Sequence, residues 1–342
     1  MTTQLSTGEL IRYASGIMEG LPYKLSVFPA TAIGGYGNPK SATVRLSVEY
    51  PLKSTLLNIS VSGKNLAVRK LLWKVSLGTV TLVREFKPQV IIRSNDRSYA
   101  SIVFDVAQIL REPGKYELSI SCESSESVRI DEVGLMGIIP LEGASVYLNY
   151  WAGETTIAPG ESYELELRNE NEGKAGLVMV FTMPSRNAPM AVYIGENKVT
   201  NVAGIVGTDE ITLKEVKVPK NAVISVRHLR TGVNYYPKSV MLHEIVSYIP
   251  LSPGPRIELD VRPSGEDIEV YLKNTGSSVA YNVVVVGISG GFMVFREVVE
   301  SIMPNEEKSI LFRVAKKVMS PFIVRAVYYG VWGQTIVSKR LK

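Results

Sequence analysis

Alternation of apolar and polar residues with a period of two runs through most of this 342-residue chain and constrains its fold more than any other feature. It is clear over residues 42–49, 116–121 and 163–168, where apolar residues take turns with charged or hydroxyl-bearing ones. Successive side chains of a β-strand point to opposite faces of its sheet, so this period indicates strands with one buried and one exposed face. The sequence therefore predicts a protein built mainly of β-sheet.

Turn-forming pairs separate the alternating segments, among them Asn38-Pro39, Pro113-Gly114 and Pro159-Gly160. Short strands punctuated in this way are typical of antiparallel β-sandwiches and not of βαβ units. Apolar residues make up 45% of the chain, and a chain of this length fills about two or three domains. We therefore expect an all-β fold of three tandem antiparallel sandwiches, two of them jelly-roll-like and one immunoglobulin-like.

Two similar junctions mark the domain boundaries. Residues 138–143 read Ile-Ile-Pro-Leu-Glu-Gly, residues 249–254 read Ile-Pro-Leu-Ser-Pro-Gly, and each comes between two alternating segments. Proline and glycine in such runs favour a linker. We expect a terminal segment over 1–22, followed by sandwiches over the ranges 23–140, 141–250 and 251–342.

The segments before these junctions are also alike. Residues 127–133 read Ser-Val-Arg-Ile-Asp-Glu-Val and residues 239–245 read Ser-Val-Met-Leu-His-Glu-Ile, and both run into Ile-Pro-Leu after a short spacer. A spacing of about 110 residues is too long for a solenoid repeat and suits a β-sandwich. The first two sandwiches are therefore predicted to be diverged copies of one fold.

The amino-terminal segment carries a different period. Ser6 and Glu9 have the spacing of a helix capping box, and Gly20 followed by Pro22 ends the pattern. The apolar residues between them recur at helical spacing: Leu10, Ala14, Ile17 and Leu21. We predict a short amphipathic helix over 7–20 whose apolar face docks the chain to a partner in an assembly.

Two resemblances to known domain families follow from longer motifs. Residues 113–120 and 128–135, with 99–110 before them, resemble the last strands of galactose-binding-like and carbohydrate-binding-module jelly rolls. Residues 257–285 and 302–307 resemble the CARDB-type immunoglobulin-like modules of prokaryotic surface proteins. The second resemblance implies a spacer or adhesion unit, and neither implies a catalytic site.

Charge and terminal sequence narrow the function classes. The net charge of +5 is small for this length and is not gathered into a basic stripe, so we expect no nucleic-acid partner. The first residues lack a positive and an apolar region of a secretory signal, and no stretch has the roughly 20 apolar residues of a membrane span. With four glutamines and one cysteine, the composition is low in heat-labile residues, which suggests a thermophilic protein.

Residues that could carry chemistry are few and scattered. Cys122 ends a strand without a histidine nearby in the sequence, and the two histidines, His228 and His243, are isolated. Asp131 and Glu132 are neighbours on a strand and are expected to point to opposite faces, so they form no acid–base pair with each other. We therefore expect no enzyme, no cofactor and no metal site.

Aromatic clusters offer the one candidate ligand site. Sugars are commonly bound by stacking on exposed aromatic rings, although tyrosines also fill sandwich cores. The candidate residues lie in the second sandwich and are Tyr147, Tyr150, Trp151, Tyr235 and Tyr236.

The sequence thus favours an interaction protein without catalysis. We expect a structural or assembly protein, either a virion component such as a spike, turret or capsid vertex, or a subunit of a surface appendage. The expected location is the virion, the cell surface or the extracellular space, and the expected partners are proteins or further copies of the chain. The alternative is a carbohydrate-binding or adhesive surface protein whose partners include glycans.

Overall fold

The computed structural model describes residues 7–64, 66, 71–94, 97–169, 172–230, 239–264, 267–313 and 322–341. These residues form 26 strands, and no helix occurs among them. The chain divides into two compact units. Unit 1 comprises residues 1–16, 23–139 and 147–249, and unit 2 comprises residues 17–22, 140–146 and 250–342. The expected all-β architecture is confirmed.

Unit 1 contains two sandwiches, each made of a larger and a smaller sheet. In the first sandwich the larger sheet has the order β2 (Leu21–Val27), β11 (Val128–Ile139), β5 (Lys53–Gly63), β9 (Arg97–Asp105) and β8 (Val90–Ser94), with β3 (Thr31–Ile33) also paired to β11. The smaller sheet has the order β4 (Ser41–Val48), β10 (Gly114–Glu123), β6 (Leu72–Leu77) and β7 (Val80–Val83).

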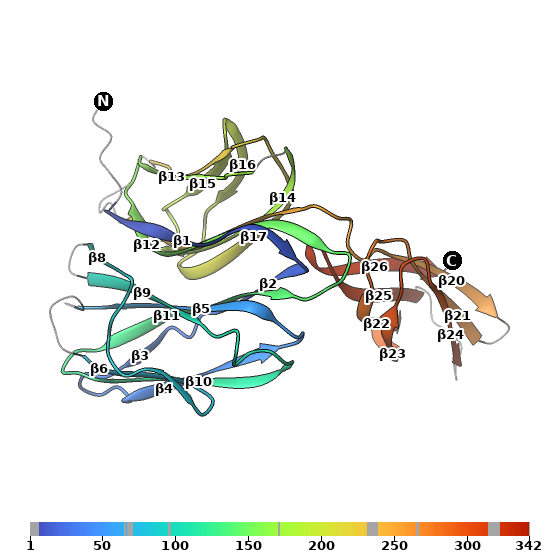
Figure 1. The fold of residues 1–342 in the computed structure, drawn as a ribbon, viewed down its shortest axis with the longest axis horizontal. Coiled ribbons are helices and arrows are strands. Elements are labelled where there is room, and N and C mark those ends of the chain that lie inside the picture. The colour runs from blue at the N-terminus through green and yellow to red at the C-terminus, as the bar shows by residue number, and fades with distance from the viewer. Residues whose placement is uncertain are drawn as a thin grey trace. The chain divides into compact units, whose positions relative to one another are not determined.

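The second sandwich is built in the same way. Its larger sheet has the order β1 (Thr7–Glu19), β12 (Ser145–Ile157), β19 (Val240–Pro250), β14 (Gly173–Met183) and β17 (Gly207–Val218). Its smaller sheet has the order β13 (Ser162–Glu166), β18 (Val223–His228), β15 (Met190–Ile194) and β16 (Asn197–Val202). The two larger sheets face each other, so unit 1 is a stack of four sheets (Figure 1).

The strand orders of the two sandwiches correspond strand for strand. The smaller sheets run β4-β10-β6-β7 and β13-β18-β15-β16, and the larger sheets share the cores β2-β11-β5-β9 and β12-β19-β14-β17. Corresponding strands also follow the same order along the chain. This common topology is what duplication of one sandwich produces, and β11 and β19, which carry the repeated sequence motif, are equivalent strands.

The predicted amino-terminal helix is wrong, because residues Thr7–Glu19 form strand β1 at the edge of the second sandwich. Gly8 and Gly16 have φ values of 111° and 137°, which no helix allows. Gly8 also lies so close to the Glu154 carbonyl of β12 that a side chain there would clash with it. Pairing with β12 therefore overrides the local helical spacing.

The four apolar residues assigned to that helix share no common face. Leu10 packs into the core of the second sandwich and Leu21 is buried, whereas Ala14 is half-buried and Ile17 is 68% exposed. Their proposed role as one docking face does not fit the strand.

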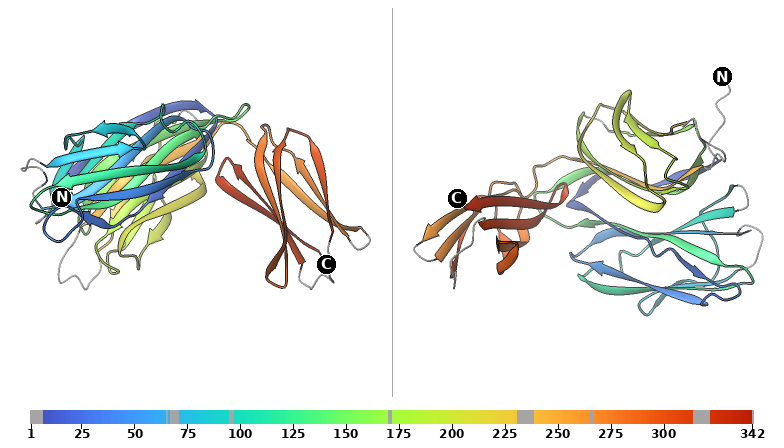
Figure 2. Two further views of the ribbon diagram at one scale, coloured as in Figure 1. Left: turned by 90° about the horizontal axis from the view of Figure 1, so that it is seen from below. Right: turned by 180° about the vertical axis from the view of Figure 1, so that it is seen from behind.

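Unit 2 is a third antiparallel sandwich, visible from two further directions in Figure 2. One sheet has the order β20 (Ile257–Ser264), β21 (Asp267–Asn274) and β24 (Glu307–Arg313). The other has the order β23 (Phe292–Ile302), β22 (Ala280–Ser289), β25 (Phe322–Gly330) and β26 (Gly333–Leu341). Their inward side chains, such as Val270, Val285 and Val324, form one apolar core.

Candidate functional sites: a polar pocket and an exposed edge strand

Equivalent β-bulges interrupt the equivalent strands β11 and β19. Along β11, Ile130 pairs with Val61 and Glu132 with Ser60, so Asp131 has no opposite residue on β5. A bulge inserts one residue into a strand and turns two consecutive side chains towards one face.

The bulge in β19 lies at the matching position of the second copy. Leu242 pairs with Phe181 and Glu244 with Val180, which leaves His243 as the inserted residue. Leu242 and the following Ile245 both belong to the apolar core of their sandwich. The two residues between them, His243 and Glu244, therefore point away from this core, towards the larger sheet of the first sandwich.

The expectation that Asp131 and Glu132 point to opposite faces is therefore wrong. Both side chains are buried, with 7% and 0% exposure, and both interact electrostatically with His243 of the second sandwich. Strict alternation fails here because the bulge shifts the phase of β11 by one residue. The interface between the two sandwiches consequently contains four ionisable groups from the repeated motif.

Lys24, on β2, is the cation at the centre of one half of this interface. Its Nζ lies 2.5 Å from Glu244 Oε2 and 3.7 Å from Glu132 Oε1, and all three side chains are at most 8% exposed. The Tyr150 hydroxyl donates to Glu244 Oε1 at 2.9 Å. Burial alone would lower the pKa of Lys24, but the carboxylates of Glu244 and Glu132 reverse this and raise it. Lys24 therefore stays charged.

Glu132 is buried in this interface with few interactions that stabilise its charge. Neither of its carboxylate oxygens has a hydrogen-bond partner in the described part of the chain. Burial, followed by the nearby Glu244 carboxylate, raises the pKa of Glu132 well above its ordinary value. Glu132 is therefore harder to ionise than an ordinary glutamate.

The missing side chain of Gly134 makes room for these groups. A Cβ on Gly134 would lie 2.7 Å from Lys24 Nζ and 2.9 Å from Glu132 Oε1, and it would also clash with Glu244. Any larger residue would displace the ion pair.

His243 occupies the other half of the interface. Its Nδ1 lies 2.8 Å from Glu154 Oε2 on β12, and its Nε2 lies 2.7 Å from the Thr182 hydroxyl on β14. Burial would lower the pKa of His243, but the Glu154 carboxylate outweighs it and raises the pKa to about 9. His243 is therefore an imidazolium at neutral pH, donating from both ring nitrogens.

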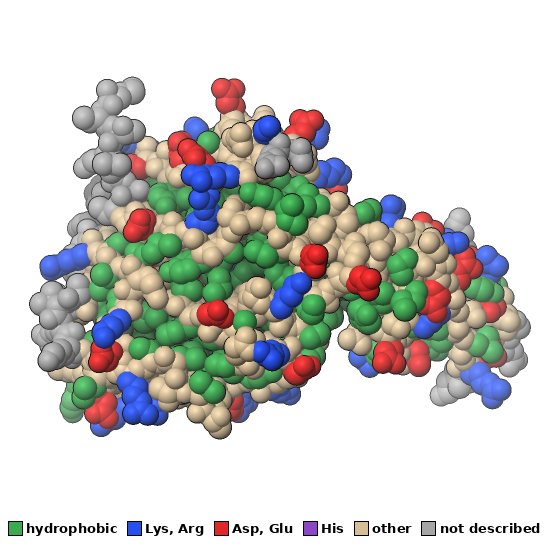
Figure 3. All heavy atoms as spheres, viewed as in Figure 1, with side chains coloured by type: hydrophobic (Ala, Val, Ile, Leu, Met, Phe, Trp, Pro, Cys, Tyr) green, Lys and Arg blue, Asp and Glu red, His purple; other side chains and the backbone are tan. Residues whose placement is uncertain are grey.

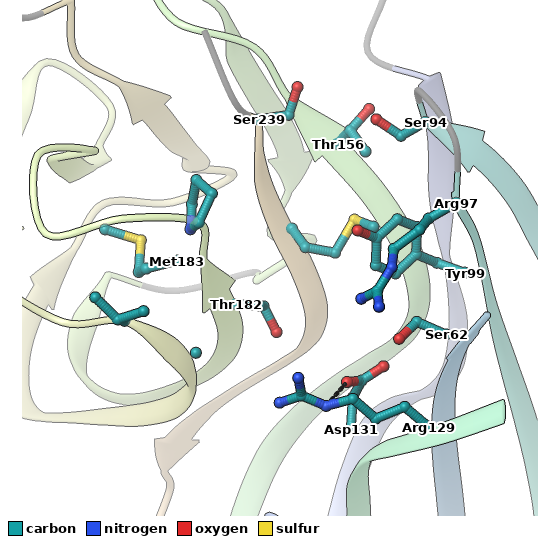
Figure 4. A pocket seen from close by; sticks show the side chains of 14 residues that line it. Ser62, Ser94, Arg97, Tyr99, Arg129, Asp131, Thr156, Thr182, Met183 and Ser239 are labelled. Atoms are coloured by element: carbon teal, nitrogen blue, oxygen red, sulfur yellow. Dashed lines mark ion pairs between the residues drawn. The ribbon is translucent and has the colours of Figure 1, made fainter. Parts of the chain in front are cut away.

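A pocket of about 400 Å³ opens beside His243, between the facing sheets. The first sandwich supplies a polar wall that includes Ser62, Arg97, Arg129 and Asp131. The wall from the second sandwich has an apolar part, formed by Met183, Pro184, Val206 and Met241, and three hydroxyl groups, from Thr156, Thr182 and Ser239. Figure 4 shows Arg97 and Arg129 directed into this pocket, with Thr182 and Met183 opposite them.

The charged groups of the pocket are unevenly paired. Arg129 Nε lies 3.0 Å from Asp131 Oδ1, whereas Asp131 Oδ2 is buried and has no hydrogen-bond partner among the described residues. Burial raises the pKa of Asp131, although Ser62, His243 and both pocket arginines oppose that shift. Arg97 is exposed and forms no ion pair with a described residue. Among the described residues, the pocket therefore contains a guanidinium without an ion pair, that of Arg97, and a carboxylate oxygen without a hydrogen bond, Oδ2 of Asp131.

The aromatic residues predicted to stack on sugars are placed differently. Tyr150 and Trp151 are buried, with 0% and 3% exposure, so neither presents an open ring face. Tyr147 is half-buried against the core of the second sandwich. Tyr235 and Tyr236 lie outside the described residues. Stacking on an open ring face does not fit Tyr150 and Trp151, and sugar binding stays a prediction for Tyr147, Tyr235 and Tyr236.

Cys122 and His228, two further candidates from the sequence, are both buried. Cys122 is buried, and burial raises its pKa to about 11, so its thiol is a poor nucleophile. His228 is also buried, next to the Ile157 carbonyl, and this burial lowers the pKa of its imidazole. Within the described ranges, no three His, Cys, Asp or Glu side chains are arranged to hold a metal ion, and no helix could cross a membrane.

The second notable feature is strand β23, at one edge of a sheet in unit 2. Phe292, Met293, Val294 and Val298 are 77%, 63%, 47% and 43% exposed. Edge strands are usually protected by charges, as the Lys339-Arg340 pair protects β26 at the other edge. The first four residues of β23 carry no charge.

On the face drawn in Figure 3, apolar side chains cover much of unit 1, and charged ones are scattered among them and around the rim. Scattered exposed apolar residues are ordinary on protein surfaces. A run of them along an edge to which no strand of the described ranges pairs is unusual, and this singles out β23.

Comparison with known proteins adds no family. No protein-family model matches the chain, and no curated protein matches it. Among solved structures, the β-glucuronidase of Ruminococcus gnavus is 15% identical with a TM-score of 0.21, over 57% of this chain and 35% of that chain. The β-D-glucuronidase of Dictyoglomus thermophilum is 10% identical with a TM-score of 0.21, over 57% and 36%.

PNGase F of Flavobacterium meningosepticum, a glycosylasparaginase, is 10% identical with a TM-score of 0.27, over 67% of this chain and 95% of that chain. This chain spans little more than a third of the two glucuronidases. At such TM-scores none of these similarities bears on what the chain does. Its fold is established by its own strand pairing, and its family is not assigned.

Proposed function

We propose that this chain is a non-enzymatic structural protein that assembles through the edge strand β23. The observation that carries the proposal is the exposure of Phe292, Met293 and Val294 on a strand whose outer edge pairs with no described strand. An edge strand of this kind is a template for pairing with another chain. The assembly we favour is a virion or a surface appendage.

A second copy of the chain is the occupant that fits β23 best. Antiparallel pairing of two β23 strands about a twofold axis at Val298 places Val298 opposite Val298. In the same register Arg296 lies opposite Glu300 of the second copy. Val298 is 43% exposed, so pairing would bury apolar surface on both copies.

The charges in this register are complementary. Arg296 and Glu300 are both exposed and lie on the same face of β23 as Val298. The twofold axis brings each arginine to the glutamate of the other copy, giving two opposite-charge cross-strand pairs. Like charges directly opposite each other are avoided.

Charge reversal tests this arrangement by analytical ultracentrifugation. The wild-type chain is expected to sediment with twice the monomer mass of 37.6 kDa. Arg296→Glu places two like-charge pairs in the interface, as does Glu300→Arg, and each variant alone should be monomeric. The double variant Arg296→Glu/Glu300→Arg restores opposite charges and should recover the dimer.

Two results would contradict the proposal. A wild-type chain that stays monomeric at every concentration removes self-assembly through this strand. Dimers that tolerate either single reversal place the contact elsewhere. The exposed Arg45→Glu change on β4, in the other unit, is the matched control and should leave the mass unchanged.

A further inference from the structure

We infer that the pocket between the two sandwiches binds a small hydroxylated carboxylate, a sugar acid, with its carboxylate on Arg97 and a hydroxyl on Asp131. This inference is independent of assembly through β23, because it concerns a different unit of the chain. It rests on the unpaired groups of the pocket and on its two unlike walls.

Arg97 supplies the anion specificity. It lines the pocket without an ion pair to any described residue, whereas Arg129 is already held by Asp131 at 3.0 Å. A guanidinium presents a planar fork of donors that matches the two oxygens of a carboxylate. The Arg97 guanidinium is therefore expected to bind one carboxylate group of the ligand.

Asp131 requires a hydrogen-bond donor from the ligand. Its Oδ2 atom is buried and lacks a hydrogen-bond partner in the described part of the chain, at 7% exposure of the whole residue. Buried carboxylate oxygens without partners are rare, and one that lines a pocket calls for a donor from the ligand. A hydroxyl group next to a carboxylate provides it, whereas a simple anion such as acetate does not.

The opposite wall fits the ring of a sugar. Met183, Pro184 and Met241 offer an apolar surface to the C–H face of a pyranose. The volume of about 400 Å³ lies near the lower end of the range of about 300–1,000 Å³ for small-ligand pockets. A ligand of monosaccharide size is therefore expected.

Isothermal titration calorimetry on the full chain tests the inference with four probes: D-glucuronate, D-glucose, glucose 6-phosphate and acetate. Glucuronate should bind at least tenfold more tightly than the other three. Equal binding of glucose would show that Arg97 contributes no anion recognition. Tighter binding of the sugar phosphate would replace the carboxylate with a phosphate, and no binding of glucuronate would overturn the inference.

Two variants locate the binding. Arg97→Gln changes an exposed side chain and should weaken glucuronate binding at least tenfold. Arg93→Gln is the matched control, since Arg93 lies on the neighbouring strand β8 and alternates away from the pocket-lining Ser94; its affinity should stay within twofold. Asp131→Asn, checked for folding by circular dichroism, should reduce discrimination between glucuronate and acetate. Unchanged affinity in Arg97→Gln would refute the site.

Discussion

The buried imidazolium of His243 should make the stability of unit 1 depend on pH in a defined way. The pKa of His243 rises from its ordinary value of 6.5 to about 9 in the folded chain. At 1.36 kcal/mol per pH unit this interval corresponds to about 3 kcal/mol. The stabilisation is fully present below about pH 6.5 and is lost as the pH rises to about 9, because the folded state holds the proton more tightly than the unfolded chain.

The carboxylates that face the ring set the size of this effect. Glu154 lies at 2.8 Å from Nδ1, and Glu132 and Asp131 of the facing sheet add to the attraction. His243→Gln removes the charge and keeps a side-chain amide in its place. The wild-type advantage in the free energy of unfolding over this variant should shrink by about 3 kcal/mol between pH 6.5 and 9.

Guanidinium denaturation of both proteins across this pH range measures the difference, and nitrogen NMR of the imidazole gives the pKa directly. His228→Gln is the control: because the pKa of His228 is lowered in the folded state, its own contribution changes only below pH 6.5. Parallel stability curves for wild type and His243→Gln, or an imidazole that titrates near 6.5, would refute the reasoning.

Three further changes probe the same interface. Lys24→Met leaves Glu244 and Glu132 without their cation and should destabilise the protein by about 3–5 kcal/mol in urea titrations; a loss below about 1 kcal/mol would show that the ion pair is not buried as described. Glu132→Gln should become progressively more stable than wild type as the pH rises above 4.5, because the raised pKa of Glu132 means that its ionised form destabilises the folded wild type. A stability difference between the two proteins that is the same at pH 4 and at pH 8 would contradict this. Gly134→Ala should lower the stability by about 1–3 kcal/mol through overpacking, measured by calorimetry, whereas Gly114→Ala on β10, where a Cβ has room, should change it far less.

Much of the architecture could be predicted from the sequence because sheet periodicity is a local signal. The alternation over residues 42–49 and 116–121 falls on β4 and β10, which pair with each other. The repeated motif at 127–133 and 239–245 falls on the equivalent strands β11 and β19. The domain duplication inferred from it matches the two strand orders.

The amino-terminal strand shows where local signals fail. Leu10, Ala14 and Ile17 have helical spacing, but β1 (Thr7–Glu19) is fixed by pairing with β12 (Ser145–Ile157), which lies far away in the sequence. Gly8 and Gly16 were the available signal, because glycine is a poor helix former and tolerates the positive φ that both residues adopt.

The charge network between the two sandwiches could not be predicted from the sequence for a related reason. Asp131-Glu132 and His243-Glu244 occupy the same positions of the repeat, each a pair of adjacent polar residues inside an otherwise apolar strand. Two consecutive polar residues break strict alternation and are a signal for a bulge. Their partners, Lys24 and Glu154, come from other strands, so only the folded chain brings the charges together.

Hydrogen exchange tests the central claim most directly, because it reports whether the backbone of β23 pairs with a second copy. Exchange of amides in Phe292–Ile302 should slow as the protein concentration rises through the dimerisation range, while exchange in β26, Gly333–Leu341, stays constant. Exchange rates in β23 that do not change with concentration, or protection that appears on β26 instead, would contradict assembly through this edge.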